Sequence, residues 1–259
     1  MNDIEIIKRA KELQKNKTEE KQNRLKEMKL KKEENLKNEI KEKAYIEKKD
    51  AITFLNTFED NSIDLLITDP PYSTDVENIE EFAKEWVEVA IKKIKQDGRG
   101  YICIGGYPKE LNAYFNVLLK QDKFIVDNPL IWTYKNTLGQ TPKMKYNLNY
   151  QVILHLYNKK SSELNRGITN EMFSVMEINA PDGRQGDRYH TWQKPLELGE
   201  RLIRHSDLGL KRESSIIVDC FACTGTFLLA AAKQGYKSYG CDINDENIAI
   251  AIQRGVLKR

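Results

Sequence analysis

Cysteines and long apolar runs are both scarce in this chain. Its 259 residues include only four cysteines, too few for a disulfide scaffold of this length, so we expect all four to be reduced: Cys103, Cys220, Cys223 and Cys241. No stretch approaches the ~18 to 20 uninterrupted apolar residues of a membrane-spanning helix. The first residues also lack the basic-then-apolar pattern of a signal peptide. The sequence therefore predicts a cytoplasmic protein that does not contact a membrane.

Metal ligands are also few. Cys220 and Cys223 form a CxxC pair, but a structural zinc site needs four ligands. The chain has no second pair of this kind and only three histidines, His155, His190 and His205. Small side chains packed in a turn are the simpler interpretation of the two cysteines. We therefore predict no metal centre.

Glycine and proline are absent from the first 44 residues. This segment is rich in Lys, Glu, Leu, Gln and Asn, and it predicts one long helix from about Asp3 to about Ala44. Residues 1–45 hold 14 Lys and Arg against 10 Asp and Glu, a net charge of +4, whereas the rest of the chain has a net charge of −1. All of the positive excess thus lies in this N-terminal arm, residues 1–44.

The apolar side chains of the arm form an interrupted stripe. Two groups fit one helical face: Ile4, Ile7, Ala10 and Leu13, then Leu25, Met28, Leu36 and Ile40. Gln14 to Arg24 offer nothing apolar to bury. Such a helix needs a partner for stability, so we expect a coiled coil that forms a homodimer or binds a heteromeric partner. Contact between its lysines and nucleic acid, or a simply solvated charged face, are the alternatives.

From about Tyr45 onward, short apolar runs alternate with charged amphipathic stretches, which predicts an α/β domain with a mostly parallel sheet over residues 45–259. The expected strands are Ile63–Thr68, Tyr101–Ile104, Leu130–Thr133, Val152–Tyr157, Ile216–Asp219 and Ser238–Asp242. The expected helices are Ile79–Ile94, Lys109–Lys120, Leu196–Arg204, Thr226–Gln234 and Glu246–Arg254. Residues 158–189 are rich in loop signals.

Asp69, Pro70, Pro71 and Tyr72 follow directly after an apolar strand. The two prolines fix the backbone where the chain leaves the sheet, at the edge where open α/β sheets bind ligands. The Asp69 carboxylate and the Pro70 carbonyl can accept both hydrogens of an exocyclic amine and leave its lone pair free to attack, while Tyr72 offers a face for a base to stack on. An ordinary proline-rich turn is the alternative.

A second strand, Ile216–Asp219, leads into the small-residue turn Cys220 to Thr226 and then a helix. Asp219 at the strand tip can take hydrogen bonds from a cationic amino group. A later strand ends at Asp242 and Ile243, where an acidic residue suits the two hydroxyls of a ribose. The turn lacks the Gly-Lys-Ser/Thr triplet of a phosphate loop, which indicates a nucleoside ligand without a pyrophosphate. Two tight strand-to-helix turns without a ligand are the alternative.

Taken together and in this order, the motifs resemble the β-class amino-methyltransferases that use S-adenosylmethionine (AdoMet) on DNA. Asp69 to Tyr72 looks like the family's catalytic tetrapeptide, and it precedes the AdoMet turn, as the β class requires. Residues 190–197, which read His-Thr-Trp-Gln-Lys-Pro-Leu-Glu, resemble the segment before the AdoMet-binding strand. Asp50, before Phe54 and Leu55, is similar to the acidic residue that contacts the adenine of AdoMet. The resemblance covers about Tyr45 to the C-terminus and omits the arm.

The resemblance implies a Rossmann-like fold and, with Asp rather than Ser opening the tetrapeptide, methyl transfer from AdoMet to the adenine-N6 amine of a flipped base in DNA. The implied catalytic residues are Asp69, Pro70, Pro71 and Tyr72. The implied AdoMet-binding residues are Asp50, Lys194, Asp219, Phe221, Ala222, Cys223, Gly225, Thr226, Asp242 and Ile243. A small recognition insert is expected at about residues 136–189.

The sequence also departs from the family pattern. Cys220 replaces a proline and Cys223 a glycine of the AdoMet turn, so Cys223 adds a side chain where the backbone should pass near the cofactor. Gln151 stands where many members have Glu. Two other functions stay open: a non-catalytic assembly subunit of a heteromeric methyltransferase, and an amino-methyltransferase that acts on RNA or protein.

Overall fold

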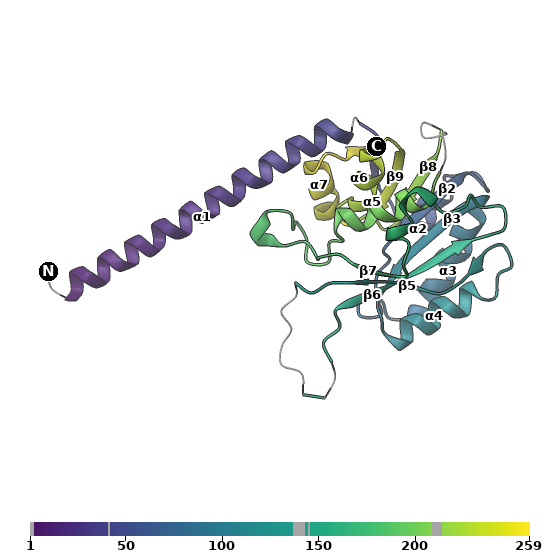
Figure 1. Ribbon diagram of the computed structural model, residues 1–259, viewed down its shortest axis with the longest axis horizontal. Coiled ribbons are helices and arrows are strands. Elements are labelled where there is room, and N and C mark those ends of the chain that lie inside the picture. Colours follow the sequence, from purple (N-terminus) through teal and green to yellow (C-terminus); the bar gives the residue numbers. More distant parts are fainter. Residues whose placement is uncertain (1–2, 41, 137–142, 145, 209–213) are drawn as a thin grey trace.

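The computed structural model describes residues 3–40, 42–136, 143–144, 146–208 and 214–259. Within these ranges, ten strands form one sheet, packed between two layers of helices, and a single long helix projects from one side (Figure 1). The strands are β1 (Ala44–Lys48), β2 (Ile63–Thr68), β3 (Ile94–Ile104), β4 (Ile125–Val126), β5 (Leu130–Thr133), β6 (Tyr150–Tyr157), β7 (Val175–Glu177), β8 (Ile216–Asp219), β9 (Lys237–Asp242) and β10 (Leu257–Lys258).

The sheet is mostly parallel, as the sequence predicts. The strand order is β10-β1-β9-β8-β2-β3-β6-β5-β7, with β4 also paired to β6. Strands β1, β9, β8, β2 and β3 run parallel to one another. Strand β6 is antiparallel to β3, β4 and β5. The carboxyl ends of β1, β9, β8 and β2 therefore meet at one edge of the sheet.

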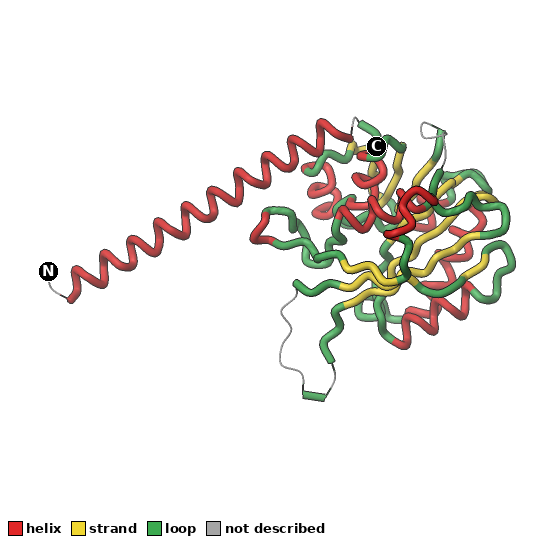
Figure 2. Tube along the Cα trace, viewed as in Figure 1, coloured by secondary structure: helices red, strands yellow, loops and turns green. Residues whose placement is uncertain are grey.

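Helices cover both faces of this sheet (Figure 2). One face packs against α2 (Ala51–Leu55), α3 (Ile79–Lys93) and α4 (Pro108–Leu118). The other packs against α5 (Leu196–His205), α6 (Thr226–Lys233) and α7 (Asp245–Gln253). Two short 3-10 helices, Arg166–Glu171 and Gly183–Gln185, lie in the loop-rich stretch between β6 and α5.

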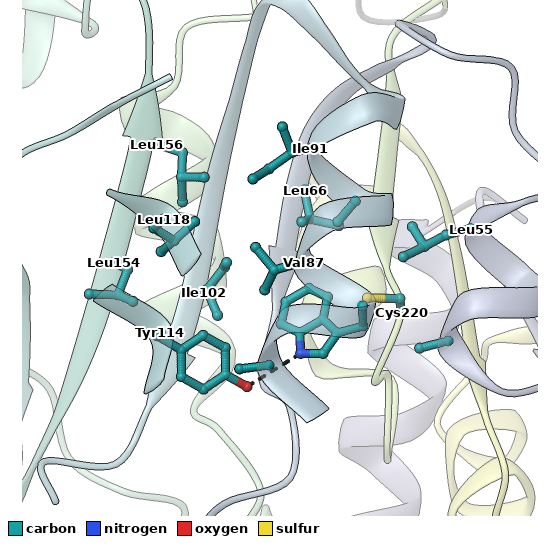
Figure 3. Close-up of a cluster of buried hydrophobic side chains, with 14 of the residues drawn as sticks. Leu55, Leu66, Val87, Ile91, Ile102, Tyr114, Leu118, Leu154, Leu156 and Cys220 are labelled. Carbon is teal, nitrogen blue, oxygen red and sulfur yellow. Dashed lines mark hydrogen bonds between the residues drawn. The ribbon is translucent and has the colours of Figure 1, made fainter. Parts of the chain in front are cut away.

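The core under α3 and α4 follows from the helical spacing of their apolar residues. The buried side chains of α3 recur every three or four positions and point toward the sheet: Ile79, Ala83, Trp86, Val87, Ala90 and Ile91. Figure 3 shows Val87 and Ile91 facing Leu66 and Ile102 of the sheet, with Tyr114 and Leu118 of α4 beside them. The indole nitrogen of Trp86 donates to the Tyr114 hydroxyl at 3.4 Å, which satisfies a buried polar group.

The N-terminal arm is the helix α1 (Asp3–Ile40), and it ends four residues before the predicted end, because β1 begins at Ala44. Residues 11–24 are exposed and extend away from the domain (Figure 1). The end of the helix instead packs on its own domain, where Ile40 is buried and Leu36 contacts the same cluster beside α6 and α7. No helix in the described part of the chain is long and apolar enough to cross a membrane.

The structure corrects part of the prediction that the apolar stripe of the arm binds a partner. Leu36 and Ile40 pack inside the chain's own domain and are not free to pair subunits. Leu25 is half-buried and Met28 is exposed, so a partner contact through these two residues stays a prediction. The sequence alone could not separate the two cases, because an apolar helical stripe fits a second subunit and the same chain equally well.

Two further differences come from strand pairing. Strand β3 begins at Ile94 instead of the predicted Tyr101, because Ile94 pairs with Ile63 of β2 and, after a register shift, Arg99 pairs with Leu65. Strands β1, β4, β7 and β10 were not predicted. The expected recognition insert, about 136–189, contains β6, which is central to the sheet, while its residues 137–142 and 145 lie outside the described residues.

Candidate active site

Four neighbouring parallel strands each deliver an aspartate to the same edge of the sheet. Asp69 follows β2, Asp219 ends β8, Asp242 ends β9, and Asp50 lies two residues beyond β1. These strands are consecutive in the order β1-β9-β8-β2, so the four carboxylates that the sequence singles out come together although they span 192 residues of chain. The structure thus brings the predicted target site and the predicted cofactor site to one place.

A cavity of about 680 Å³ opens at this edge, a size typical of small-molecule sites. Nine of the predicted site residues line it: Asp50, Asp69, Pro70, Pro71, Tyr72, Phe221, Cys223, Asp242 and Ile243. Four more predicted residues, Lys194, Asp219, Ala222 and Thr226, line a small adjoining cavity that shares Asp69 and Phe221 with it. Gly225 lines neither cavity. Glycine is required there, because its φ is +75° and any Cβ would lie only 2.8 Å from the Val256 side chain.

Phe82 and Trp86 of α3, which were not predicted as site residues, form an aromatic wall of the cavity with the predicted Phe221. Phe221 stacks edge-on against Trp86 with ring centroids 5.2 Å apart, and lies 5.8 Å from Phe82. Both α3 residues line the cavity. Their spacing of four residues indicated only a buried helix face, which is the common meaning of that pattern. His190 and Trp192 also line the cavity, from the segment that precedes α5.

The Asp69 carboxylate lies at the centre of a compact hydrogen-bond network. The Tyr72 hydroxyl donates to Asp69 Oδ1 at 2.8 Å, and the buried Lys194 ammonium forms an ion pair with Asp69 Oδ2. The Tyr72 hydroxyl accepts from Lys194 Nζ at 2.9 Å and from Gln151 Nε2 at 2.8 Å. Burial and the neighbouring Asp69 charge raise the pKa of Tyr72 well above its usual value, so its hydroxyl stays a neutral donor.

Lys194 contacts the residues of the tetrapeptide, and its predicted contact with AdoMet stays a prediction. The resemblance placed it among the AdoMet-binding residues, but its ammonium contacts the catalytic tetrapeptide, at Asp69 and Tyr72. It lies in the small adjoining cavity and not in the large one. A buried lysine in an ion pair helps to fix the orientation of the carboxylate it contacts.

Glu110 is a buried residue beside the tetrapeptide that sequence reasoning missed. It lies on α4, is fully buried, and its Oε1 accepts from the backbone N–H and the hydroxyl of Ser73, at 2.7 and 2.8 Å. These bonds anchor the residue that follows Tyr72. The sequence carries only a weak signal for this role, because a glutamate in the first turn of a helix is ordinarily explained by the helix dipole.

Asp219 is buried beneath the turn of residues 220–226, called the cofactor turn below because the sequence predicts that it binds AdoMet. Its Oδ1 accepts from the Thr68 hydroxyl at 2.7 Å and from the Phe221 N–H at 3.2 Å. Desolvation raises its pKa to about 7, because the hydrogen bonds only partly offset the loss of water. A cationic ligand beside this buried carboxylate would stabilise its negative charge.

Asp242 and Asp50 hold the backbone around the cavity. Asp242 Oδ2 accepts from the Cys223 N–H at 2.9 Å, and its Oδ1 accepts from the Asn244 N–H at 2.8 Å. Asp50 is the N-cap of α2 and accepts from the Thr53 N–H at 2.9 Å. Hydrogen bonds from the Thr53 side chain and then from its backbone lower the pKa of Asp50. Both carboxylates thus stay oriented toward the cavity by their neighbours.

The two cysteines of the CxxC pair lie in this turn. Cys220 is buried and Cys223 half-buried, and burial raises the pKa of both thiols. Within the described ranges, no three or more His, Cys, Asp or Glu side chains are grouped in a way that could hold a metal ion. The pair therefore forms part of the packed turn.

Comparison with known proteins assigns the family. A family model described as DNA methylase, for N6 and N4 amino-methyltransferases, matches residues 63–253. The chain belongs to this family. Membership confirms the DNA amino-methyltransferase that the motifs predicted, with AdoMet as its cofactor.

Individual relatives agree with this assignment. The Type II methyltransferase M.HpaI of Haemophilus parainfluenzae is 28% identical over 233 residues, which cover 79% of this chain and 71% of that protein. The Type II methyltransferase M1.MboII of Moraxella bovis is 23% identical over 250 residues, with 78% of this chain and 93% of that protein covered.

Solved structures share the fold. The PvuII DNA methyltransferase, named as cytosine-N4-specific, superposes with a TM-score of 0.66 at 19% identity, over 82% of this chain and 86% of that one. A complex of M1.HpyAVI with SAM superposes with a TM-score of 0.63 at 20% identity, over 81% of this chain and 98% of that one. This DNA methylase therefore has the Rossmann-like fold expected from its sequence.

Proposed function

We propose that this DNA methylase transfers the AdoMet methyl group to the N6 amine of an adenine that is flipped out of duplex DNA. The observation that carries the proposal is Asp69, an aspartate rather than a serine, at the carboxyl end of β2 and on the wall of the open cavity. It lies beside Tyr72 and is oriented by Lys194. An ionised carboxylate is the strongest available acceptor for an amine hydrogen.

The residues around the cavity fit AdoMet. Phe221, Phe82 and Trp86 give an apolar aromatic wall that suits an adenine ring, and Asp50 and Asp242 are oriented carboxylates that suit hydroxyl and amine donors. Asp219, buried and short of charge compensation, suits the cationic amino group. When bound, AdoMet supplies an electrophilic methyl carbon.

The chain's own residues prepare the target amine. Asp69 and the Pro70 carbonyl accept its two hydrogens, which leaves the nitrogen lone pair free for direct attack, and Asp69 then receives the proton that the methylated nitrogen loses. Tyr72 offers the stacking face for the flipped base. Pro70 and Pro71 hold the carbonyl and the ring in place, since each fixes its own φ angle. No covalent intermediate with the enzyme is required.

The class of substrate can be tested directly. Purified protein is incubated with labelled AdoMet and, in separate reactions, unmethylated genomic DNA, structured RNA or protein extract. Label is expected in DNA, and its incorporation should be lost in Asp69→Asn, which keeps the size of the side chain but removes the charged acceptor. Label that enters RNA or protein instead would contradict the proposal. An inactive protein that still binds AdoMet would indicate an assembly subunit.

A further inference from the structure

Tyr189 connects the arm to the active-site domain. Its ring lies between two cations, with Lys29 Nζ of α1 at 5.0 Å from the ring centroid and Arg254 Cζ at 5.1 Å. A cation over an aromatic face is attracted to the ring, and more strongly where water is excluded. Tyr189 directly precedes His190, whose side chain lines the large cavity. The arm therefore contacts the segment that forms part of the cofactor site.

Glu33 is the buried charge of the arm. Its side chain is 6% exposed, whereas its neighbour Glu34 is exposed. Glu33 Oε1 accepts from the Tyr189 hydroxyl at 3.1 Å and from Gln253 Nε2 at 2.9 Å. A carboxylate on a solvated helix has no need of such burial, because burial of a charge is unfavourable unless the charge is paired. The hydrogen bonds of Glu33 are therefore a specific contact between the arm and the domain.

Arg254 joins this contact to the cofactor turn. Its Nη1 donates to the Thr224 carbonyl at 2.7 Å and to the hydroxyls of Thr224 and Thr226, both at 3.0 Å. The side chain is 4% exposed, and desolvation lowers its pKa to about 10, so the guanidinium remains charged at neutral pH. The negative charge of Glu33 helps to keep it so.

The turn that Arg254 clamps is strained. Cys223 has a φ of +46°, in the left-handed region that is unfavourable for a residue with a side chain. Such a conformation persists only where its surroundings enforce it. The Arg254 bonds at Thr224 and Thr226 supply that constraint from one side, and the Asp242 bond to the Cys223 N–H supplies it from the other.

We propose that Glu33 is a positioning residue for the cofactor turn, which acts through Tyr189 and Arg254, so that docking of the arm and binding of AdoMet favour each other. The proposal rests on the proposed role of the turn in holding AdoMet. None of Glu33, Tyr189 and Arg254 lines the large cavity, so their effect on AdoMet is indirect. Coupling of this kind is reciprocal by thermodynamic necessity.

The first test compares matched variants. Glu33→Ala should weaken AdoMet binding about five- to tenfold by calorimetry, with kcat at saturating AdoMet unchanged within about twofold. Glu34→Ala is the control and should bind as the wild type does. Glu33→Gln keeps an oxygen that accepts from Tyr189, so it should recover most of the affinity. Equal affinities in Glu33→Ala and Glu34→Ala would overturn the proposal.

A double-mutant cycle separates coupling from general loss of stability. Tyr189→Phe removes only the hydroxyl that donates to Glu33 and leaves the ring between its two cations, so it is the variant to use if Glu33→Ala does not fold. It should weaken AdoMet binding by a similar factor. Combining the two changes should add no further loss, because both break the same contact. If the losses of AdoMet affinity from the two single variants multiply in the double variant, Glu33 and Tyr189 do not act through the same contact.

Reciprocity provides a readout that does not depend on activity. AdoMet should slow backbone hydrogen exchange in residues 29–40 of wild-type protein, and not in Glu33→Ala. No protection in the wild type would contradict the coupling. If AdoMet binds and Asp242→Ala weakens it while Glu33 variants do not, the coupling fails and the proposed function stands. If Asp242→Ala also leaves AdoMet affinity unchanged, the assignment of the cofactor turn itself fails.

Discussion

The Thr68 hydroxyl donates a buried hydrogen bond of 2.7 Å to the carboxylate of Asp219. Thr68 is the last residue of β2 and directly precedes Asp69, while Asp219 is the last residue of β8, the neighbouring strand. One bond thus links the strand that precedes the proposed catalytic aspartate, Asp69, to the strand that leads into the cofactor turn. The bond therefore joins the proposed target side of the site to the proposed cofactor side.

AdoMet affinity should depend on the protonation of Asp219. Its pKa is raised to about 7, so at lower pH the folded protein carries a neutral carboxyl group that no longer balances the amino group of AdoMet. Affinity should fall by up to about tenfold per pH unit below 7. Calorimetry from pH 5 to 8 measures this, and Asp219→Asn should bind weakly without that slope. The same slope in Asp219→Asn would assign it to another group.

The same shift predicts the opposite trend for folding stability without cofactor. Because the folded-state pKa of Asp219 is raised above the ordinary aspartate value of 3.8, folding takes up a proton. The stabilisation is complete below about pH 4 and is lost as pH rises through about 7. Relative to Asp219→Asn, wild-type stability in urea should decline by about 1 to 3 kcal/mol between pH 5 and 8. A constant difference would argue against a buried Asp219 that titrates.

Substitutions of Asp69 and Asp242 should affect different steps, turnover in one case and AdoMet binding in the other. Asp69→Ala should abolish turnover and leave AdoMet affinity within a few fold, because Asp69 is proposed to contact the target amine. Asp242→Ala should weaken AdoMet binding by about 1 to 3 kcal/mol, the loss expected for a charge-assisted hydrogen bond. Calorimetry in which Asp69→Ala loses AdoMet as severely as Asp242→Ala would reject this division.

Lys194→Met tests whether Lys194 serves the catalytic or the cofactor side. The structure connects its ammonium to Asp69 and Tyr72, so the variant should lower kcat about a hundredfold through misplacement of the carboxylate. AdoMet affinity should change by less than about threefold. A raised Kd for AdoMet with normal kcat would instead support the role implied by the family resemblance.

Cys223 should tolerate glycine better than a branched side chain. Cys223→Gly relieves a left-handed backbone but increases the freedom of the unfolded chain, and the two effects are similar in size. The free energy of unfolding should change by less than about 1 kcal/mol. Cys223→Val should lose about 1 to 3 kcal/mol, because a β-branched residue fits φ of +46° poorly. The free energy of unfolding of both variants is measured by urea titration. Equal losses in the two variants would contradict a strained backbone at Cys223.

Sequence reasoning found the parts of the site that local patterns encode. Asp69 follows a predicted strand and Asp219 and Asp242 end two others, so their position at one edge of a parallel sheet could be predicted. Their grouping with Asp50 was available only from the family resemblance. Lys194 shows the limit, because nothing in its neighbours along the chain indicates an ion pair with a residue 125 positions away.

The contact between arm and domain could not be predicted for a similar reason. Glu33 has the sequence surroundings of any solvated glutamate, and Tyr189 lies in a segment without periodicity. Only the approach of α1 to the domain reveals their bond, at a position where Gly255 has a φ of +113° and a Cβ would lie 2.9 Å from Ile40. The polar start of β3 was missed because pairing with β2, and not side-chain pattern, makes it a strand.

The identity of the methylated nucleoside is the most direct test of the central claim. Unmethylated genomic DNA contains many possible recognition sequences, so the protein can be tested on it with labelled AdoMet before its own sequence is known. The DNA is then digested to nucleosides and separated against standards. The account predicts label in N6-methyldeoxyadenosine, absent with Asp69→Ala. Label in N4-methyldeoxycytidine would contradict it.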